Sequence, residues 1–184
     1  MIFDLPTTLT VCGVEYEIRT DFRDILNILL AFDDPDLSNS EKALVCLYIL
    51  YVDFEDIPQD AYKQAFDAAL EFIDNGMEGK PNSPRTMDWE QDAPILFPAV
   101  NNAAGFETRS AKYIHWWTFL GYFMEIKDGT FSTVLSLRLK RAKNKKMEQW
   151  EKDFWKENVR ICQLHTKLTE EEKAEKERLN ALLG

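Results

Sequence analysis

Few residues of this chain have the types and spacing that catalysis or metal binding requires. The two histidines, His115 and His165, lie far apart in the sequence, and neither has neighbours at metal-ligand spacing. Neither a GxxxxGK[ST] phosphate-binding loop nor a GxSxG nucleophile motif occurs. The sequence therefore predicts no bound metal, no cofactor and no catalytic centre, and we expect a protein that is not an enzyme.

Acidic pairs are the remaining candidates for acid–base chemistry. Examples are Asp33-Asp34 and Glu90 with Asp92, but general acid–base catalysis also needs a pocket that shifts a pKa. Because an acidic chain produces such pairs by chance, we interpret them as solvated surface. His115 is better explained as a structural, hydrogen-bonded histidine than as a metal ligand or general base.

The cysteines and the N-terminus bear on the cellular compartment. Cys12, Cys46 and Cys162 are odd in number and widely separated, unlike a disulfide framework or paired CxxC motifs, so we expect free thiols. Residues 1–10 do not combine a basic start with an apolar run, which predicts no secretory signal. The expected location is a cytoplasm.

Charge is divided unevenly along the chain. Residues 1–139 hold 10 Lys/Arg and 23 Asp/Glu, a net charge of −13, whereas residues 140–184 hold 12 and 9, a net charge of +3. The basic run consists of Lys140, Arg141, Lys143, Lys145 and Lys146. No aromatic residue interrupts this run, and the acidic remainder repels polyanions, so we expect no nucleic-acid partner.

Two groups of apolar residues in the C-terminal part are candidate partner-binding residues. Trp150, Phe154 and Trp155 recur at helical spacing and either anchor a partner helix or pack back on the protein's own core. The last helical segment is polar except for a leucine patch, which suits docking on a partner or a second copy. That patch consists of Leu179, Leu182 and Leu183.

Residues 113–126, YIHWWTFLGYFMEI, carry the densest aromatic surface of the chain. At 100° per residue, His115, Thr118, Gly121 and Glu125 fall on one narrow stripe, and apolar side chains cover the rest. A helix that is apolar around most of its girth has to be enclosed by other elements. The segment is too short and too polar to span a bilayer, so we expect no membrane association. It predicts the central helix of a soluble, mainly α domain.

The elements around this helix follow from local signals. Residues 8–11 and 14–19 alternate apolar and polar side chains on either side of Cys12-Gly13, which predicts a β-hairpin that packs on helices. Residues 21–32 place their apolar side chains on one helical face. Ser38 and Glu41 have capping-box spacing ahead of a second helix.

Later signals continue the helical pattern. A third helix is expected from near Pro58 to Asn75-Gly76, followed by a loop over residues 76–87. Asp88 is a candidate cap for a helix that Pro94 and Pro98 would kink or delay. We therefore divide the chain into a helical domain with an N-terminal hairpin, residues 1–142, and a charged C-terminal helical extension, residues 143–184.

Three patterns occur in a fixed order: VEYEIRTDFRDIL, MDWEQDAPILFPAVNNAAGFE, and YIHWWTFLGYF followed by FSTVLSLRLKR. Together they resemble the bacteriophage Gp-fifteen (Gp15) family, whose genes lie near the tape-measure gene of siphophages and prophages. The resemblance covers residues 5–142, and Pro94 and Pro98 depart from the smoother helix that it implies there. The motif residues, which we interpret as structural, are Tyr16, Arg19, Arg23, Asp92, His115, Trp116, Trp117, Phe119 and Arg138.

The resemblance implies a tail-assembly chaperone or the companion of one. A tape-measure protein is long and helical, and its apolar faces are exposed until the tail tube polymerises around it, which makes them prone to aggregate. A small acidic helical protein can cover such faces by packing helix against helix. The expected partners are therefore a tape-measure or tail-tube protein, with self-association as a further possibility. The alternative is a minor structural component of the tail that stays in the virion.

Overall fold

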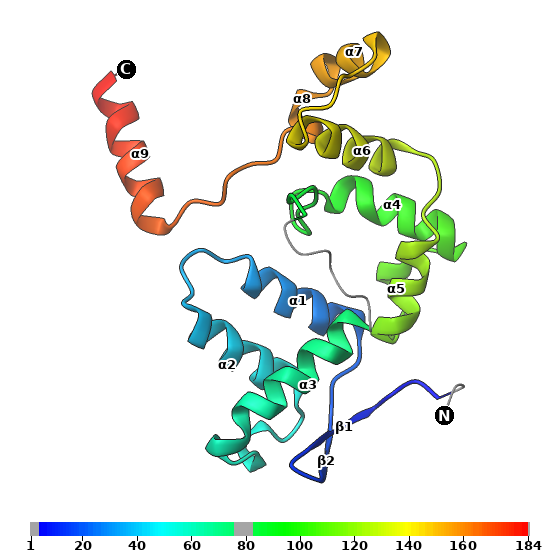
Figure 1. The fold of residues 1–184 in the computed structure, drawn as a ribbon, viewed down its shortest axis with the longest axis vertical. Helices are drawn as coiled ribbons and strands as arrows, with labels where there is room; N and C mark the ends of the chain where they lie inside the picture. Colours follow the sequence, from blue (N-terminus) through cyan, green and yellow to red (C-terminus); the bar gives the residue numbers. More distant parts are fainter. Residues whose placement is uncertain (1–3, 76–82, 184) are drawn as a thin grey trace.

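The computed structural model describes residues 4–75 and 83–183, without the side chains of residues 176, 177 and 179–183. This part of the chain is built mainly of helices, with one two-stranded antiparallel sheet near the N-terminus (Figure 1). The predicted mainly α fold with an N-terminal hairpin is confirmed. Most of the predicted loop over residues 76–87 lies outside the described residues, and residues 83–87 form neither helix nor strand.

The hairpin pairs strand β1 (Thr8–Val11) with strand β2 (Val14–Glu17). Both turn residues lie in the left-handed region, with φ of 51° at Cys12 and 82° at Gly13, the geometry that a two-residue type I′ turn requires. The hairpin packs against helix α3 (Tyr62–Asp74), as its marginal stability in isolation predicts.

Two further helices complete the N-terminal half. Helix α1 (Phe22–Phe32) begins at its cap Asp21, and helix α2 (Asn39–Leu50) begins at Ser38, which forms the predicted capping box with Glu41. Two 3-10 turns, η1 (Phe54–Asp56) and η2 (Gln59–Ala61), join α2 to α3. The fully buried large side chains of this half are Val11, Phe22, Ile25, Ile28, Leu47, Leu50 and Tyr51.

The aromatic helix is shorter than residues 113–126. Helix α5 spans Trp116–Met124, because the residues before it pair in extended form with the segment ahead of α1. There the N–H of Phe22 donates to the carbonyl of Ile114 at 3.0 Å, and the N–H of Trp116 donates to that of Thr20 at 2.7 Å. Local periodicity could not reveal this long-range pairing.

Helix α4 (Ala93–Ala104) starts late, in line with the two prolines in its sequence. Pro94 lies in the first turn, where its missing N–H is not needed, and Pro98 lies inside the helix. The expected cap Asp88 serves the preceding turn instead of the helix. Its carboxylate accepts from the N–H groups of Glu90 at 2.9 Å and Gln91 at 2.7 Å.

The C-terminal part packs on helix α6 (Thr130–Ala142) through a small second core. Val134, Leu137 and Cys162 form this core, and they join α6 to the short helix α8 (Val159–Cys162). Helix α7 (Gln149–Glu157) lies ahead of α8, and helix α9 (Glu170–Leu183) ends the chain. The proposed boundary between residues 142 and 143 stays a prediction.

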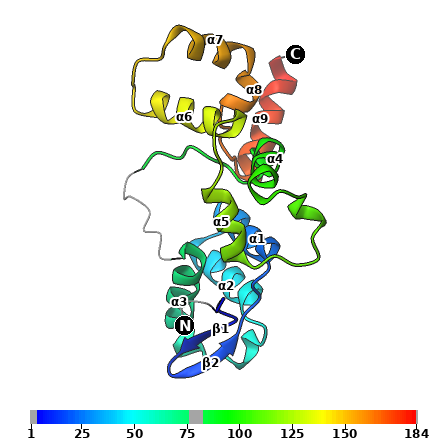
Figure 2. The same ribbon diagram turned by 90° about the vertical axis from the view of Figure 1, so that its right-hand side faces the viewer.

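The elements are arranged along one long axis. The hairpin and α3 lie toward one end, α6 and α7 lie toward the other, and α5 lies between α1 and α4 (Figures 1 and 2). An irregular segment joins α8 to α9. The N–H of Glu170, the first residue of α9, donates to the carboxylate of Asp36 at 3.0 Å. The two ends of the molecule therefore carry different elements.

Candidate functional site

The motif arginines near the N-terminus, Arg19 and Arg23, fasten chain segments to one another. The guanidinium of Arg19 donates to the carbonyls of Ile49 at 2.9 Å and Tyr51 at 2.8 Å, where α2 ends. Arg23 forms an ion pair with Asp21 at 2.9 Å and donates to the carbonyl of Ala111 at 2.6 Å. Both side chains satisfy carbonyls that lack helical partners, so they act as structural ties.

Three motif side chains fix the start of α5. The Nδ1 of His115 accepts from the N–H of Trp117 at 3.1 Å, and its Nε2 lies 3.0 Å from the carbonyl of Pro6. This network assigns the ring proton to Nε2, so that one nitrogen caps the helix and the other donates. The indole N–H groups of Trp116 and Trp117 donate to the carbonyls of Ile73 at 2.8 Å and Phe72 at 2.9 Å. They therefore cap the last turn of α3.

Two further aromatic motif residues, Phe119 and Tyr16, belong to the same core. The ring of Phe119 stacks on Phe22, with centroids 4.5 Å apart, and the ring of Tyr16 meets Tyr51 edge-on at 6.2 Å. Trp116 and Phe119 are fully buried, and Trp117 is half-buried. These rings lie within the packed interior or at its edge, and a purely structural role of the motif residues stays a prediction.

A buried ion pair connects α6 to the turn before α4. Arg138, 4% exposed, donates to both carboxylate oxygens of Asp92, 1% exposed, at 2.7 and 2.8 Å. Its other N–H groups donate to the carbonyls of Thr86, Ile161 and Cys162. All five guanidinium donors are used, so Arg138 has none left for a substrate or partner.

Asp88 forms a second charged centre beside this pair. Its carboxylate contacts Arg85 and lies 3.7 Å from Nζ of Lys167. Burial, the largest influence, raises the pKa of Asp88, but the N–H groups of Gln91 and Glu90 and the two cations together outweigh it. The pKa therefore lies below its ordinary value. The carboxylate stays ionised and serves as an anchor for its neighbours.

The two buried thiols, Cys46 and Cys162, are poor nucleophiles in this structure. Burial raises the pKa of the Cys46 thiol to about 12, and it also raises the pKa of Cys162, where the nearby Arg138 opposes the shift. The thiolate, not the thiol, is the reactive form. Among residues 4–75 and 83–183, no group of three or more His, Cys, Asp or Glu side chains is placed to hold a metal ion.

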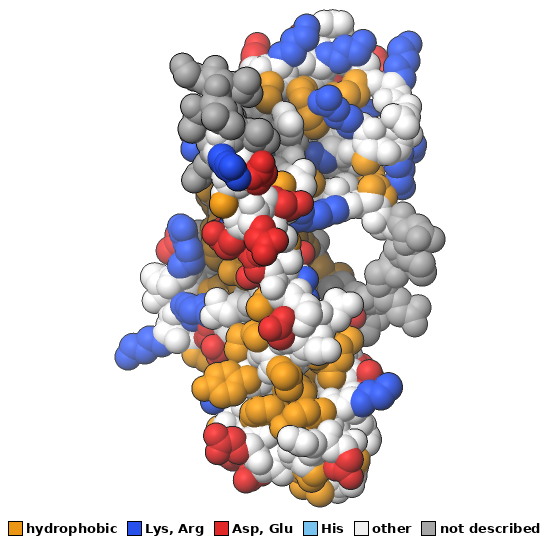
Figure 3. All heavy atoms as spheres, turned by 90° about the vertical axis from the view of Figure 1, so that its left-hand side faces the viewer, with side chains coloured by type: hydrophobic (Ala, Val, Ile, Leu, Met, Phe, Trp, Pro, Cys, Tyr) orange, Lys and Arg blue, Asp and Glu red, His pale blue; other side chains and the backbone are white. Residues whose placement is uncertain are grey.

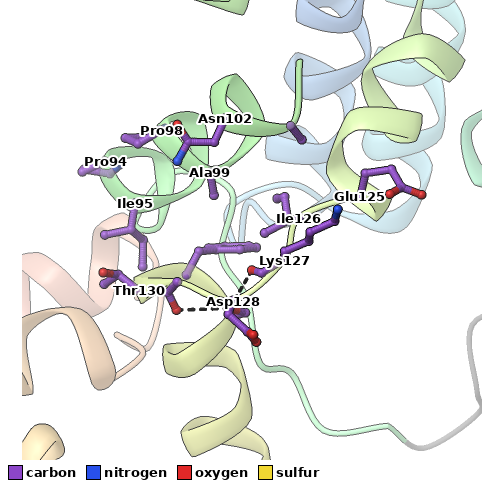
Figure 4. A pocket seen from close by; sticks show the side chains of 14 residues that line it. Pro94, Ile95, Pro98, Ala99, Asn102, Glu125, Ile126, Lys127, Asp128 and Thr130 are labelled. Carbon is purple, nitrogen blue, oxygen red and sulfur yellow. Dashed lines mark hydrogen bonds between the residues drawn. The ribbon is translucent and has the colours of Figure 1, made fainter. Parts of the chain in front are cut away.

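A hollow of about 550 Å³ lies between α4 and the segment that joins α5 to α6. Figure 4 shows Ile95 and Ala99 of α4 converging with Ile126, while the carboxylates of Glu125 and Asp128 point away. The hollow thus has an apolar floor and a polar rim without a nucleophile and base in contact. This arrangement suits packing better than chemistry.

An exposed apolar surface covers α2 and α3, and we call it the α2–α3 face. Leu44 and Tyr48 lie one helical turn apart on α2, exposed by 45% and 68%. The ring of Tyr48 meets Phe54 at 6.2 Å, and Phe54 meets Tyr62 at 5.3 Å. Hydrophobic side chains gather on this part of the molecule in Figure 3. With half-buried Phe66 one turn beyond Tyr62, these residues form a continuous aromatic and aliphatic strip.

The aromatic residues of α7 are divided between core and surface. Trp150 is 59% exposed, whereas Phe154 and Trp155 pack against the core of Val134, Leu137 and Cys162. The guanidinium of Arg141 lies over the ring of Trp155 at 4.5 Å. The side chains of the other predicted partner-binding residues, Leu179, Leu182 and Leu183, lie outside the described residues.

The fold and these surfaces define a helical protein whose polar motif residues are occupied by internal contacts. In the part of the chain that the structure describes, no helix has the length and apolar character needed to cross a membrane. The family model described as Bacteriophage Gp15 protein matches residues 2–164. The chain therefore belongs to this family, and the match continues beyond residue 142, where the sequence resemblance ended. No curated protein and no solved structure gives a significant match.

Sequence reasoning missed two features of the surface and interior. Leu44 and Tyr48 belong to the helix expected after Ser38, but the helical pattern did not separate them from the buried Leu47 and Tyr51. Asp88 was expected as a helix cap, and its contacts with Arg85 and Lys167 were not foreseen. For the exposure of Leu44 and Tyr48, the sequence offered one signal, the run of small and apolar residues in α2.

Proposed function

We propose that this chain is a phage or prophage tail-assembly chaperone that binds the tape-measure protein, the tail-tube protein or both before the tube polymerises. Membership of the Bacteriophage Gp15 family supports the phage context. The α2–α3 face carries the proposal further, because Leu44 and Tyr48 offer apolar contact area that the other described residues leave exposed. The protein acts by binding in this proposal, with no catalytic step.

The α2–α3 face fits an amphipathic helix as its occupant. Exposed apolar strips on two packed helices form the type of surface on which a partner helix lays its own apolar face. Aromatic side chains contribute strongly to binding hot spots, and Tyr48, Phe54 and Tyr62 supply three of them in contact. The acidic remainder of the chain keeps such a complex charged and therefore soluble.

Binding in this proposal is reversible and takes place in the host cytoplasm. Tail-tube subunits have to replace the chaperone when the tube forms, so a moderate contact area is an advantage. The α2–α3 face is centred on two exposed side chains and three half-buried rings. Its contact area is therefore small compared with the interface of a stable complex.

Co-expression with the tape-measure protein encoded nearby tests the proposal. The wild-type chain should raise the soluble fraction of that protein and co-purify with it, whereas Tyr48→Glu should lose both effects. Met124→Glu is the matched control, because Met124 is 61% exposed on a different helix. A tape-measure protein that precipitates equally with and without this chain, together with empty pull-downs, would contradict the proposal.

Purified virions separate this function from the alternative. A chaperone leaves before the particle is complete, whereas a minor tail component is retained. Mass spectrometry of virions should therefore detect tape-measure and tube proteins without this chain. Its presence at a fixed ratio to the tube protein would favour the structural alternative.

A further inference from the structure

A groove of about 450 Å³ at the α6–α7 end is lined by cations around one aromatic ring. We call it the basic groove. Trp155 and Met147 form its half-buried apolar part. The cations that line it are Arg141, Lys145, Lys152 and Lys156.

The cations of the basic groove have no carboxylate partner in the part of the chain that the structure describes. Among the described residues, none of the four has a carboxylate within 4.0 Å, although neighbouring Lys140 pairs with Glu151 at 2.5 Å. No acidic side chain lines the groove. Four like charges around one hollow repel each other, and an occupant that carries carboxylates would relieve this repulsion.

The opposite end of the molecule presents a complementary surface. The turn η1 follows α2, near the hairpin end of the long axis (Figure 1). It exposes the carboxylates of Asp53, Glu55 and Asp56, and we call it the acidic turn. Across the described residues, these three carboxylates also lack a cation within 4.0 Å.

Around the acidic turn, the negative charge of the carboxylates also lacks a free cation within the described part of the chain to balance it. Asp24 lies beside it, and the pKa of this carboxyl is raised by burial and by the charge of Asp21, with Arg19 and Arg23 opposing the shift. The Nη1 and Nη2 groups of Arg19 donate to backbone carbonyls from Tyr48 to Val52. Among the described residues that line this region, Arg19 is the one cation, and backbone acceptors already occupy it.

We propose that the basic groove of one copy receives the acidic turn of a second copy of this chain. The contact pairs three carboxylates with four cations, and it places Tyr48 and Phe54 of one copy near Trp155 and Met147 of the other. Because the two surfaces lie at opposite ends, the association is head-to-tail and heterologous. It produces open chains, or a ring if the rotation closes.

A second copy fits the groove better than nucleic acid does. A nucleic acid supplies phosphates, but it is a polyanion that extends beyond the groove. The strongly acidic residues 1–139 would repel its remaining phosphates. The acidic turn is a short segment that supplies carboxylates and aromatic rings together at one end of the molecule. Charges farther away than a Debye length, about 8 Å at physiological salt, are largely screened for so local a contact. The inference is independent of the proposed tape-measure partner.

Charge-reversal variants test this association by sedimentation velocity. Lys152→Glu/Lys156→Glu and Asp53→Lys/Glu55→Lys should each weaken self-association by about tenfold or more, because like charges then face each other. Mixing the two variants should restore association, since each reversed surface meets a complementary one. Combining all four substitutions in one chain should restore it as well.

The controls make the outcome decisive. Lys112→Glu/Lys127→Glu reverses the same amount of charge as the groove variant, but at two exposed lysines outside both surfaces. It should leave association unchanged. Circular dichroism and melting temperature confirm that each variant is folded. A wild-type chain that stays monomeric at all concentrations and salt levels would overturn the proposal. It would also be overturned if the mixture failed to associate, or if the groove variant lost oligonucleotide binding while self-association was unchanged.

Discussion

Arg138 shows how one residue can hold three segments of the chain together. Its guanidinium joins the carboxylate of Asp92 to carbonyls of the segment before α4 and of α8. Such a pair contributes little net stability compared with a well-packed apolar pair, yet breaking it is costly because one charge is left buried and alone. This pair of motif residues therefore specifies how segments of the chain meet.

Arg138→Met should destabilise the protein by about 3–5 kcal/mol, because Asp92 is left as an uncompensated buried charge. Urea unfolding measures the change. Lys143→Met is the matched control: Lys143 is exposed, and its replacement should change stability by less than about 0.5 kcal/mol. Adding Asp92→Leu to Arg138→Met should recover at least about 1 kcal/mol, and strictly additive losses would argue against coupling of the two charges.

Asp88 predicts a pH dependence of stability. Its pKa in the folded state lies below the ordinary value of 3.8, so the folded protein binds the proton less readily than the unfolded chain. The stability that Asp88 contributes is therefore complete above about pH 4 and is lost as pH falls through the lower folded-state pKa. The stability gap between wild type and Asp88→Asn should shrink between about pH 6 and about pH 2 in urea titrations. A gap that is constant with pH would show that this carboxylate is not perturbed.

At the scale of elements, α5 organises the contact between the two halves of the molecule. Its two indole N–H groups cap α3, its N-terminal cap is fixed by His115, and its buried face packs on α1 and α4. The helix is short because the residues before it are extended. A short helix with few intrahelical bonds depends on tertiary packing for its stability.

Trp116→Phe and Trp116→Ala separate the hydrogen bond from the packing of α5. The Phe variant leaves the carbonyl of Ile73 without its indole partner and should cost about 1–3 kcal/mol. The Ala variant also removes a buried ring and should cost about 3–5 kcal/mol. Trp117→Ala should cost less than Trp116→Ala because Trp117 is only half-buried. An unchanged melting temperature for Trp116→Ala would exclude a core role.

Truncation after Leu168 tests whether α9 belongs to the folded body. This end point retains Lys167, whose ammonium group lies near the carboxylates of Asp88 and Glu90. The truncated chain should keep a cooperative thermal melt and the same helical signal per residue. It should bind a phage partner more weakly, because it lacks the predicted partner-binding residues Leu179, Leu182 and Leu183. Lys167→Met in the full chain is the control for that contact. A truncated chain that unfolds or aggregates would assign α9 to the core.

At the scale of the whole molecule, the acidic turn and the α2–α3 face are neighbours. Phe54 lies in the turn and also contacts Tyr48 and Tyr62 of the face. A second copy bound at the turn would therefore cover part of the surface that we propose for the phage partner. Self-association would protect this apolar surface until the partner arrives.

This arrangement predicts competition between the two proposed contacts. A soluble helical fragment of the tape-measure protein should convert self-associated chains into smaller, defined complexes, because both occupants need the surroundings of Tyr48. Sedimentation velocity at rising fragment concentration measures the change. Complexes that contain the fragment and still grow with chain concentration would show that the two surfaces are separate.

Local signals in the sequence determined most of the elements. The turn at Cys12-Gly13 predicted the hairpin, and the pair Ser38 and Glu41 predicted the start of α2, because backbone geometry and capping depend on a few adjacent residues. The late start of α4 followed from Pro94 in the same way. The family patterns also identified the side chains that fasten the fold, although they did not reveal their partners.

Only the tertiary structure decided which side chains meet and which remain exposed. Arg138 and Asp92 are 46 residues apart, and Trp116 caps α3 through the carbonyl of Ile73, which lies 43 residues before it. Over such separations sequence spacing carries no contact information. Tyr48 and Leu47 are adjacent apolar residues, yet one is exposed and the other buried, because only one face of α2 meets its neighbours. The basic groove likewise arises where α7 folds back on α6, which brings Trp155 beside a lysine-rich run that contains no aromatic residue of its own.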